Sequence, residues 1–244
     1  MSSGQASASA TLAQQAAANL LHPLSLTLLA LTFSTGTVDA VSYLGLGHVF
    51  TANMTGNIVL LGFGIARAGG LPVVSPIVSL AAFVVGSGIG GALARRMADR
   101  HRAHLSYALG LEVTLLAGAA ILAAATDPHQ ASVAADATIA LMAAAMGVRN
   151  ATARRLAVPD LTTTVLTMTL TGIAADVRAK DHGRAGLGRR VLAVAAMFAG
   201  AVGGALLVLH AGTAPALGLA TGLLAVVTAG TVLAARRPGP WRAG

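Results

Sequence analysis

The 244-residue chain has no cysteine and few charged or aromatic residues. The absence of cysteine excludes disulfides, thiolate metal sites and cysteine nucleophiles. Only 10% of the residues are charged and 3% aromatic, whereas 55% are hydrophobic and the mean hydropathy is +0.76. This composition excludes a water-soluble globular enzyme. The apolar residues are mainly Ala, Leu, Val and Gly, which pack helices in lipid, so the sequence predicts an integral membrane protein.

The net charge of +8 is carried mostly by arginine, in short runs between apolar segments. Nucleic-acid binding would require Lys and Arg on one face together with aromatic or polar partners, so we expect no nucleic-acid partner. Membrane proteins instead concentrate Lys and Arg in their cytoplasmic loops. We therefore interpret the basic runs as markers of orientation, and the expected partner is the lipid bilayer.

Eight apolar segments follow one another along the chain. They cover residues 24–47, 49–66, 73–93, 105–125, 133–148, 161–175, 191–209 and 214–235. A transmembrane helix needs about 20 residues. The 161–175 segment is shorter than that and rich in threonine, so we do not expect every segment to span the membrane.

The positions of the basic residues select a topology. Basic runs follow the third, fifth, sixth and last segments, and the run after the fifth, Arg149, Arg154 and Arg155, is assigned to a cytoplasmic loop. If all segments crossed, a strongly basic loop would face outward, against the positive-inside rule. The conflict disappears if segments 49–66 and 161–175 are re-entrant or broken. The sequence thus predicts an all-α polytopic membrane protein with six transmembrane helices and both termini in the cytoplasm.

The two halves of the chain resemble each other, with an offset that drifts from 111 to 114 residues. The matched pairs are Gly36 with Gly147, Asp39 with Asn150, Thr51 with Thr163, Thr55 with Thr167, Gly86 with Gly200, and Gly90 with Gly204. Three spans and one re-entrant segment in each half would give opposite orientations, the 3+3 inverted repeat of many secondary transporters. Shared Ala/Gly bias is the alternative explanation.

These boundaries divide the chain into four parts. Residues 1–23 form a disordered or amphipathic tail, 24–126 the first membrane repeat, 127–235 the second, and 236–244 a basic cytoplasmic tail.

Each half contains one dense polar cluster, at 48–57 and at 159–172. Because interrupted segments of matched halves often build a transporter's solute site, these clusters are candidates to line a substrate path. The alternative is that the Thr and Asn side chains bond to neighbouring helices as structural glue. The candidate residues are Thr51, Asn53, Thr55, Gly56 and Asn57 in the first cluster, and Thr163, Thr167 and Gly172 in the second.

Acidic residues inside apolar segments are also candidates, because a charge at membrane depth is costly. Asp39 lies deep in the first segment, Glu112 in the fourth and Asp136 near the start of the fifth. Asp39 is the best candidate for a gating or coupling acid, with Asn150 as an orienting partner. A protonated, hydrogen-bonded Asp39 is the alternative. Glu112 is either a second coupling acid or an interfacial acid that pairs with a nearby Arg cluster.

Three GxxxG motifs favour close helix packing, within the chain for the two that match between halves and secondarily in a homodimer. They are Gly86/Gly90, Gly200/Gly204 and Gly218/Gly222. The sequence has no paired histidine spacing, Walker A loop or nucleophile motif. We therefore expect no metal, no cofactor and no enzymatic activity.

The stretch from Thr37 to Asn57, with Asp39-Ala-Val-Ser followed by Asn53-Met-Thr-Gly-Asn57, resembles the YoaK family. The stretches 147–151 and 159–163 extend the resemblance into the second half. Members of this family are uncharacterised bacterial inner-membrane proteins classed as a domain of unknown function. The resemblance implies a polytopic protein of the bacterial inner (plasma) membrane and implies no substrate.

From the residues themselves, the sequence predicts a small transporter or channel for a polar solute. Asp39 would gate or couple, and the polar clusters would line the path. The alternative is a non-transporting scaffold that binds lipid or a membrane partner through its GxxxG faces.

Overall fold

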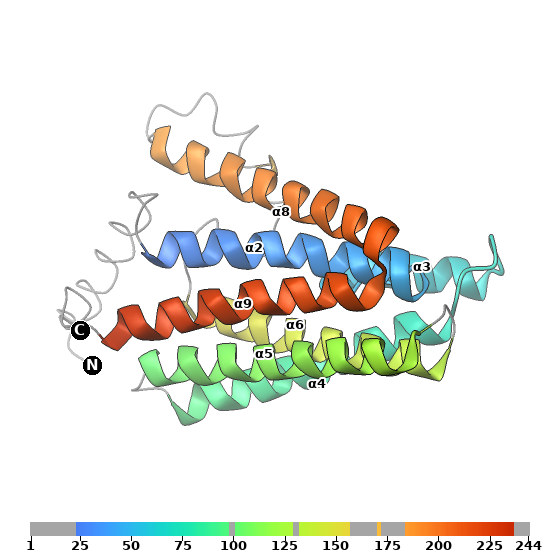
Figure 1. The fold of residues 1–244 in the computed structure, drawn as a ribbon, viewed down its shortest axis with the longest axis horizontal. Coiled ribbons are helices and arrows are strands. Elements are labelled where there is room, and N and C mark those ends of the chain that lie inside the picture. Colours follow the sequence, from blue (N-terminus) through green and yellow to red (C-terminus); the bar gives the residue numbers. More distant parts are fainter. Residues whose placement is uncertain (1–22, 98–100, 129–131, 157–169, 172–183, 237–244) are drawn as a thin grey trace.

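The computed structural model describes residues 23–97, 101–128, 132–156, 170–171 and 184–236 (Figure 1). In these ranges the chain forms seven α-helices and one π-helix, and no strand. The helices are α2 (Pro23–Val41), η1 (Ser42–Gly47), α3 (Met54–Ile65), α4 (Val74–Arg96), α5 (His101–Thr126), α6 (Val133–Leu156), α8 (Arg184–Ala211) and α9 (Thr213–Arg236). The expected all-helical fold is thus confirmed for this part of the chain.

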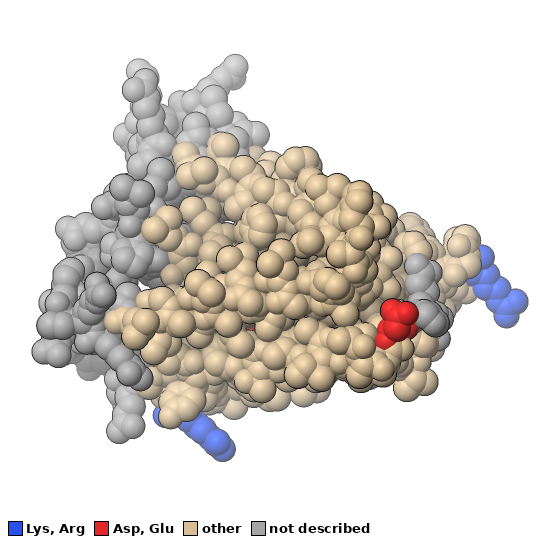
Figure 2. All heavy atoms as spheres, viewed as in Figure 1, with Lys and Arg blue, Asp and Glu red and all other residues tan. Residues whose placement is uncertain are grey.

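Four helices are long and apolar enough to cross a membrane. Their apolar stretches are Val74–Arg96, Ala103–Thr126, Arg190–Ala211 and Thr213–Leu233, in α4, α5, α8 and α9. The long helices run side by side along the molecule, and the start of α2 and the end of α9 lie at the same end (Figure 1). On the face drawn in Figure 2, charged side chains lie only towards the two ends, and the surface between them is uncharged. This distribution is the one expected for helices surrounded by lipid.

The two long helices outside that set, α2 and α6, carry polar side chains inside the protein. α2 has 19 residues and α6 has 24, so length is not what sets them apart. The apolar helices cover them, α8 and α9 packing on α2, and α4 and α5 packing on α6. Polar groups are tolerated at such depth where neighbouring helices supply partners. Their buried polar side chains are Thr32, Ser34, Thr35, Thr37 and Asp39 on α2, and Thr138, Arg149 and Thr152 on α6.

Glycines occur at close contacts between helices. A Cβ added to Gly86 of α4 would lie 2.1 Å from the carbonyl oxygen of Ala144 on α6. A Cβ added to Gly200 of α8 would lie 2.0 Å from the carbonyl oxygen of Phe33 on α2. These distances are far inside van der Waals contact, so only glycine lets the backbones approach this closely. The expected intrachain role of the Gly86/Gly90 and Gly200/Gly204 motifs is confirmed.

The reciprocal glycines on the inner helices make the corresponding contacts. A Cβ on Gly147 of α6 would lie 2.3 Å from the carbonyl oxygen of Phe83, and one on Gly36 of α2 would lie 2.1 Å from that of Met197. The α4–α6 and α2–α8 interfaces are therefore built alike, with glycine facing backbone in both directions. By contrast, a Cβ on Gly218 or Gly222 of α9 would have nothing within 4 Å.

The short helix α3 lies at the end of the molecule where α2 stops, and it packs on α4 (Figure 1). Its 12 residues extend about 18 Å, well short of the roughly 30 Å hydrocarbon core of a bilayer. Most of the other segment expected to be interrupted, 161–175, lies outside the described residues.

The structure corrects the assignment of Arg149 to a cytoplasmic loop. α6 does not end at Val148 but continues to Leu156, and Arg149 is only 3% exposed. Arg154 and Arg155 occupy the last turn of the helix, as basic residues at a membrane boundary do. The sequence pattern ends the fifth apolar segment before Arg149 because a cation normally marks the end of a transmembrane helix. In the structure the helix continues past this arginine.

Candidate functional site

Arg149 of α6 forms a buried ion pair with Glu112 of α5. The Arg149 Nε donates to Glu112 Oε1 at 2.7 Å, and Nη2 donates to the same oxygen. The two side chains are 2% and 1% exposed. Glu112 lies halfway along α5, so the pair sits at mid-height in an apolar helix. Neither charge would be tolerated at this depth without its partner.

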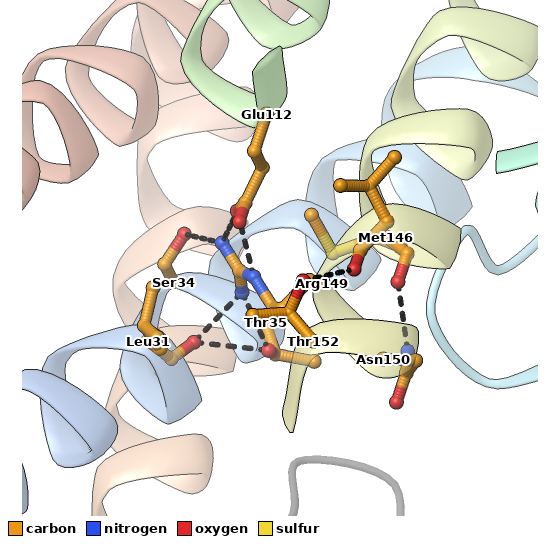
Figure 3. Close-up of polar contacts among 9 residues, drawn as sticks. Leu31, Ser34, Thr35, Glu112, Met146, Arg149, Asn150 and Thr152 are labelled. Atoms are coloured by element: carbon orange, nitrogen blue, oxygen red, sulfur yellow. Dashed lines mark hydrogen bonds and ion pairs between the residues drawn. The ribbon is translucent and has the colours of Figure 1, made fainter. Parts of the chain in front are cut away.

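The rest of the Arg149 guanidinium bonds to α2. Nη1 donates to the carbonyl oxygen of Leu31 and to Thr35 Oγ1, both at 2.8 Å, and Nη2 donates to Ser34 Oγ at 3.2 Å. Every N–H of the guanidinium thus has an acceptor. Figure 3 shows the side chain reaching from α6 toward α2, with Glu112 pointing at it from α5. One cation therefore connects three helices that belong to both halves of the chain.

A small cavity lies directly beside this pair. Its interior measures about 20 Å³, enough for one water molecule. Its walls are mostly aliphatic, and the polar groups it presents come from the ion pair and one hydroxyl. The lining residues are Leu28, Leu31, Leu105, Ala108, Leu109, Glu112, Arg149, Thr152 and Ala153. The cavity thus places a small space, lined mostly by aliphatic side chains, directly against a buried ion pair.

Asp39 anchors the start of the first polar cluster. Its Oδ1 accepts the backbone N–H of Thr51 at 3.0 Å and that of Ala52 at 2.8 Å, and its side chain is buried at 7% exposure. Between Asp39 and Thr51 the chain forms η1 and then turns at His48, whose φ of 57° is left-handed. The carboxyl group therefore satisfies two backbone donors that this turn would otherwise leave without partners.

Asn57, at the first turn of α3, holds the same turn from the other side. Its Oδ1 accepts the Phe50 N–H at 2.9 Å, and its Nδ2 donates to the Phe50 carbonyl at 2.6 Å. Nδ2 also donates to Ser79 Oγ at 3.1 Å, and that hydroxyl donates to the Phe50 carbonyl at 2.7 Å. Because Ser79 belongs to α4, this network fixes the broken segment onto a long helix.

The other candidates of the first cluster differ in environment. Asn53 is exposed and caps α3 by accepting the Gly56 N–H at 3.2 Å, and Thr55 is exposed beside it. Gly56 is half-buried against the Phe50 ring, where a Cβ would come within 2.8 Å. Thr51 is fully buried, and its hydroxyl has no hydrogen-bond partner among the described residues. The cluster therefore combines side chains that hold the backbone with side chains that do not.

The remaining candidates are not gathered at one point. Asn150 is half-buried, and its Nδ2 donates to the Met146 carbonyl of its own helix at 2.9 Å, whereas Asp39 binds backbone elsewhere. The expected Asp39–Asn150 pair is thus absent from this structure. Asp136 accepts a hydrogen bond from Ser75 Oγ at 2.6 Å. Thr163, Thr167 and Gly172 lie outside the described residues.

The sequence reasoning missed Arg149 and its α2 partners, Ser34 and Thr35. A signal was present: Arg149 follows Gly147, whose counterpart Gly36 lies deep in an apolar segment, so the repeat places residue 149 at similar depth. The adjacent polar residues Ser34 and Thr35, inside the first apolar segment, are another sign that α2 needs a polar partner.

Residues 27–230 match the family described as "Protein of unknown function (DUF1275)". The chain belongs to this family. The chain is also similar to the "UPF0700 transmembrane protein YoaK" of Bacillus subtilis (strain 168), at 36% identity over 153 residues. The aligned region covers 62% of this chain and 65% of the Bacillus protein, just under two thirds of its length. No solved structure matches the chain.

These matches confirm the resemblance to the YoaK family that the sequence motifs carried. The family match extends over every described helix apart from the ends of α2 and α9. Together with the four long apolar helices, the transmembrane relative supports the broader conclusion that this DUF1275 chain is a multi-pass membrane protein.

Proposed function

We propose that this DUF1275 protein is a transporter or channel for a small polar solute, and that the solute passes between α2 and α6 at the level of Arg149. The observation that carries the proposal is the buried Arg149–Glu112 pair beside a cavity. Charged side chains at membrane depth are rare, and in transporters they mark solute or ion paths. A protein that only packed helices could achieve the same stability with apolar side chains.

The paired glycine contacts support a 3+3 inverted repeat. Phe33 and Ala144, which receive Gly200 and Gly86, are 111 positions apart, and the two glycines are 114 positions apart. Each of these two matched glycines thus contacts the first helix of the other half. Compositional bias would not pair them reciprocally. In an inverted repeat, the solute site lies near the bilayer midplane at the interface between the repeats, and here Arg149 of α6 bonds to α2 across that interface.

In this proposal α2, α4, α5, α6, α8 and α9 cross the membrane, and α3 re-enters from the side where α2 ends. The basic ends of α4 and α6 and both chain termini face the cytoplasm, in the inner membrane of a bacterium. The support is the position of Arg95, Arg96, Arg154 and Arg155 in the last turns of their helices.

The test is the accessibility of single cysteines to a water-soluble thiol reagent, in a protein that has no cysteine of its own. Ser34→Cys and Thr152→Cys place a thiol on the proposed path, on α2 and α6. We expect both to react in membrane vesicles, because a solute path admits water. Val84→Cys, which is 67% exposed on the apolar surface of α4, is the matched control and is expected to be protected by lipid.

Protection of Ser34→Cys and Thr152→Cys from reagent on both sides would contradict the proposal. Reaction of Ala68→Cys, in the exposed loop after α3, would show in the same vesicles that the reagent is active. A sealed interior of this kind would favour a membrane scaffold.

The scaffold alternative has one observation in its favour. Gly218 and Gly222 on α9 are exposed, and nothing in the described part of the chain lies within 4 Å of where their Cβ atoms would be. Such a face is available for a second copy or another membrane protein. Loss of a cross-linked dimer on Gly222→Leu, with unchanged cysteine accessibility at the interior, would separate this role from transport.

A further inference from the structure

Among the hydrogen-bond partners of the Arg149 guanidinium, Glu112 alone is charged. Its other acceptors are a backbone carbonyl and two hydroxyls of α2, which are neutral. Both bonds from Arg149 to Glu112 go to Oε1, so the carboxylate meets the guanidinium through a single oxygen. Arginine is suited to binding a carboxylate or another oxyanion with two parallel N–H groups. Glu112 therefore occupies a position that a different anion would fit.

Space for such an anion adjoins the pair. The cavity of about 20 Å³ is bordered by Glu112, Arg149 and the Thr152 hydroxyl side chain, and otherwise by aliphatic side chains. Its size excludes a large organic anion in this conformation. Its aliphatic walls lower the local dielectric constant, which strengthens the attraction between the guanidinium and an anion.

Charge balance sets the condition for binding. Arg149 and Glu112 together are neutral when both are ionised. Adding an anion would leave a net negative charge in the middle of the apolar helices, which is costly. The charge stays balanced if Glu112 takes a proton from water as the anion arrives, because the new anion then neutralises Arg149.

From this geometry, and resting on the proposed transport function, we propose that the cavity beside Arg149 binds a small monovalent anion together with one proton. The anion replaces the Glu112 carboxylate on the guanidinium, and the proton resides on the Glu112 carboxyl group. Transport would then be electroneutral, with one anion and one proton moving in the same direction. The chemical class is that of chloride or nitrate, small inorganic anions that would occupy the cavity together with the place left by the Glu112 carboxylate.

Among the acids of the described helices, Glu112 is the one that bonds to Arg149, whereas Asp39, one turn after Thr35 on α2, interacts with the Arg149 charge without bonding to it. Asp39 lies further along α2 and binds the Thr51 and Ala52 amides, and Asp136 lies in the first turn of α6, 13 positions before Arg149. On α5 itself, His104 is buried two turns before Glu112, and Tyr107 is exposed. The other charged groups on the helices that pack against α5 lie in last turns: Arg95 and Arg96 of α4, Arg154 and Arg155 of α6, and Arg236 of α9.

The first experiment measures anion binding by thermal stability of the purified full-length protein in detergent. Sodium nitrate or chloride is compared with sodium gluconate, a bulky anion, at equal ionic strength and at about pH 5.5 and about pH 8. Wild-type protein should be stabilised by nitrate or chloride more at the lower pH. Where Glu112 is ionised without the anion, one-proton coupling makes the apparent affinity fall about tenfold per pH unit.

Two variants distinguish this mechanism from a general salt effect. Glu112→Gln imitates the protonated side chain and should be stabilised by nitrate or chloride equally at both pH values. Arg149→Gln removes the guanidinium and should lose the response at both. A Glu112→Gln protein that folds but shows no anion response would overturn the proposal, as would a wild-type response that does not depend on pH.

A second measurement uses the wild-type protein alone, in case a variant does not fold. Adding sodium nitrate to a weakly buffered sample should raise the pH, by about one proton taken up for each anion bound. No proton uptake on saturating nitrate would contradict the proposal.

Vesicles separate this inference from the proposed function. An inward nitrate gradient should acidify the lumen, and clamping the membrane voltage should not change the rate. Anion binding in detergent without flux in vesicles would remove the transport function and the coupled movement but leave the anion site. Water-accessible cysteines at positions 34 and 152 without any anion response would leave transport as the proposed function and remove the anion site.

Discussion

At the scale of single residues, the molecule depends on how Arg149 is satisfied. A buried charge is costly unless it is paired and hydrogen-bonded, so the guanidinium needs partners on every side. Glu112 supplies the charge, and Leu31, Ser34 and Thr35 supply the remaining acceptors. Removing one member leaves the others buried without a partner. A single replacement should therefore lower the free energy of unfolding more than a double replacement that removes both charges.

We predict that Arg149→Met destabilises the protein by about 3–5 kcal/mol, because it leaves the Glu112 carboxyl group without its counter-charge. The double variant Arg149→Met/Glu112→Leu should be much closer to wild type, since no buried charge then remains. Reversible unfolding in mixed detergent micelles measures both changes. Additive losses in the double variant would show that the two side chains act independently.

The burial of Arg149 also shows where residue-level prediction from sequence ends. The candidate acid Glu112 was found because it stands alone in an apolar segment. Arg149 was not, because it lies five positions before Arg154 in what resembles one basic run. The contact with Glu112, 37 positions away in the sequence, and the position of Arg149 two residues after Gly147 in the repeat distinguish it from a loop arginine. No local pattern contains that information.

At the scale of helices, glycine sets the distance between the inner and outer layers. The α4–α6 and α2–α8 interfaces bring glycine against backbone carbonyls, so neither pair can accept even one extra methyl group without moving apart. This close approach is also what lets two polar helices be covered on one side by apolar ones.

We therefore predict that Gly86→Ala and Gly200→Ala each destabilise the protein by about 1–3 kcal/mol, the usual cost of overpacking. The new methyl groups would collide with the carbonyl oxygens of Ala144 and Phe33. The matched control is Gly218→Ala on α9, where nothing lies within 4 Å and alanine also favours the helix. The temperature at which each detergent-solubilised variant loses its monodisperse elution peak ranks them.

Equal stability of Gly86→Ala and Gly218→Ala would mean that the α4–α6 contact is looser than described. That result would also weaken the inverted repeat, since the reciprocal glycine contacts are its main structural support.

Helix positions were largely predictable, whereas helix roles were not. Hydropathy located every described long helix within a few residues, apart from α6 and the early start of α8. The short α3 was expected from the charge balance of the loops. What hydropathy could not supply was the distinction between covered and covering helices. The polar residues of α2, such as Thr32 and Thr35, are compatible with a helix inside the bundle and with one on its surface until the neighbouring helices are known.

Within the first polar cluster, sequence selected the right segment but not the task of each residue. Asp39 and Asn57 both hold the turn that interrupts the chain, because buried backbone amides and carbonyls there need acceptors and donors. Those partners are 7 to 13 positions apart, and the turn geometry that joins them is set by η1 and His48. A high local frequency of polar residues cannot distinguish a side chain that hydrogen-bonds to the backbone from one that contacts a solute.

At the scale of the whole molecule, apolar helices form the outer surface and polar side chains are enclosed. Exposed aliphatic and aromatic side chains cover the outer helices, for example Val84, Ile121, Phe198 and Val226, each at least 67% exposed. Charged residues of the described helices, apart from Asp39, Glu112 and Arg149, lie toward helix ends. This arrangement is the one expected for a multi-pass membrane protein whose helices run along the membrane normal.

The orientation of the molecule in the membrane provides the last prediction. The basic last turns of α4 and α6 lie at the same end as the start of α2 and the end of α9, because these helices alternate in direction (Figure 1). By the positive-inside rule this end faces the cytoplasm. A green fluorescent protein fused after residue 244 should therefore fluoresce, and Ala68→Cys, after α3, should react with an impermeant maleimide in intact cells. Arg96→Cys, at the end of α4, should react only after the cells are permeabilised. The reverse pattern would invert the protein, place the loop after α3 in the cytoplasm and make α3 re-enter from inside.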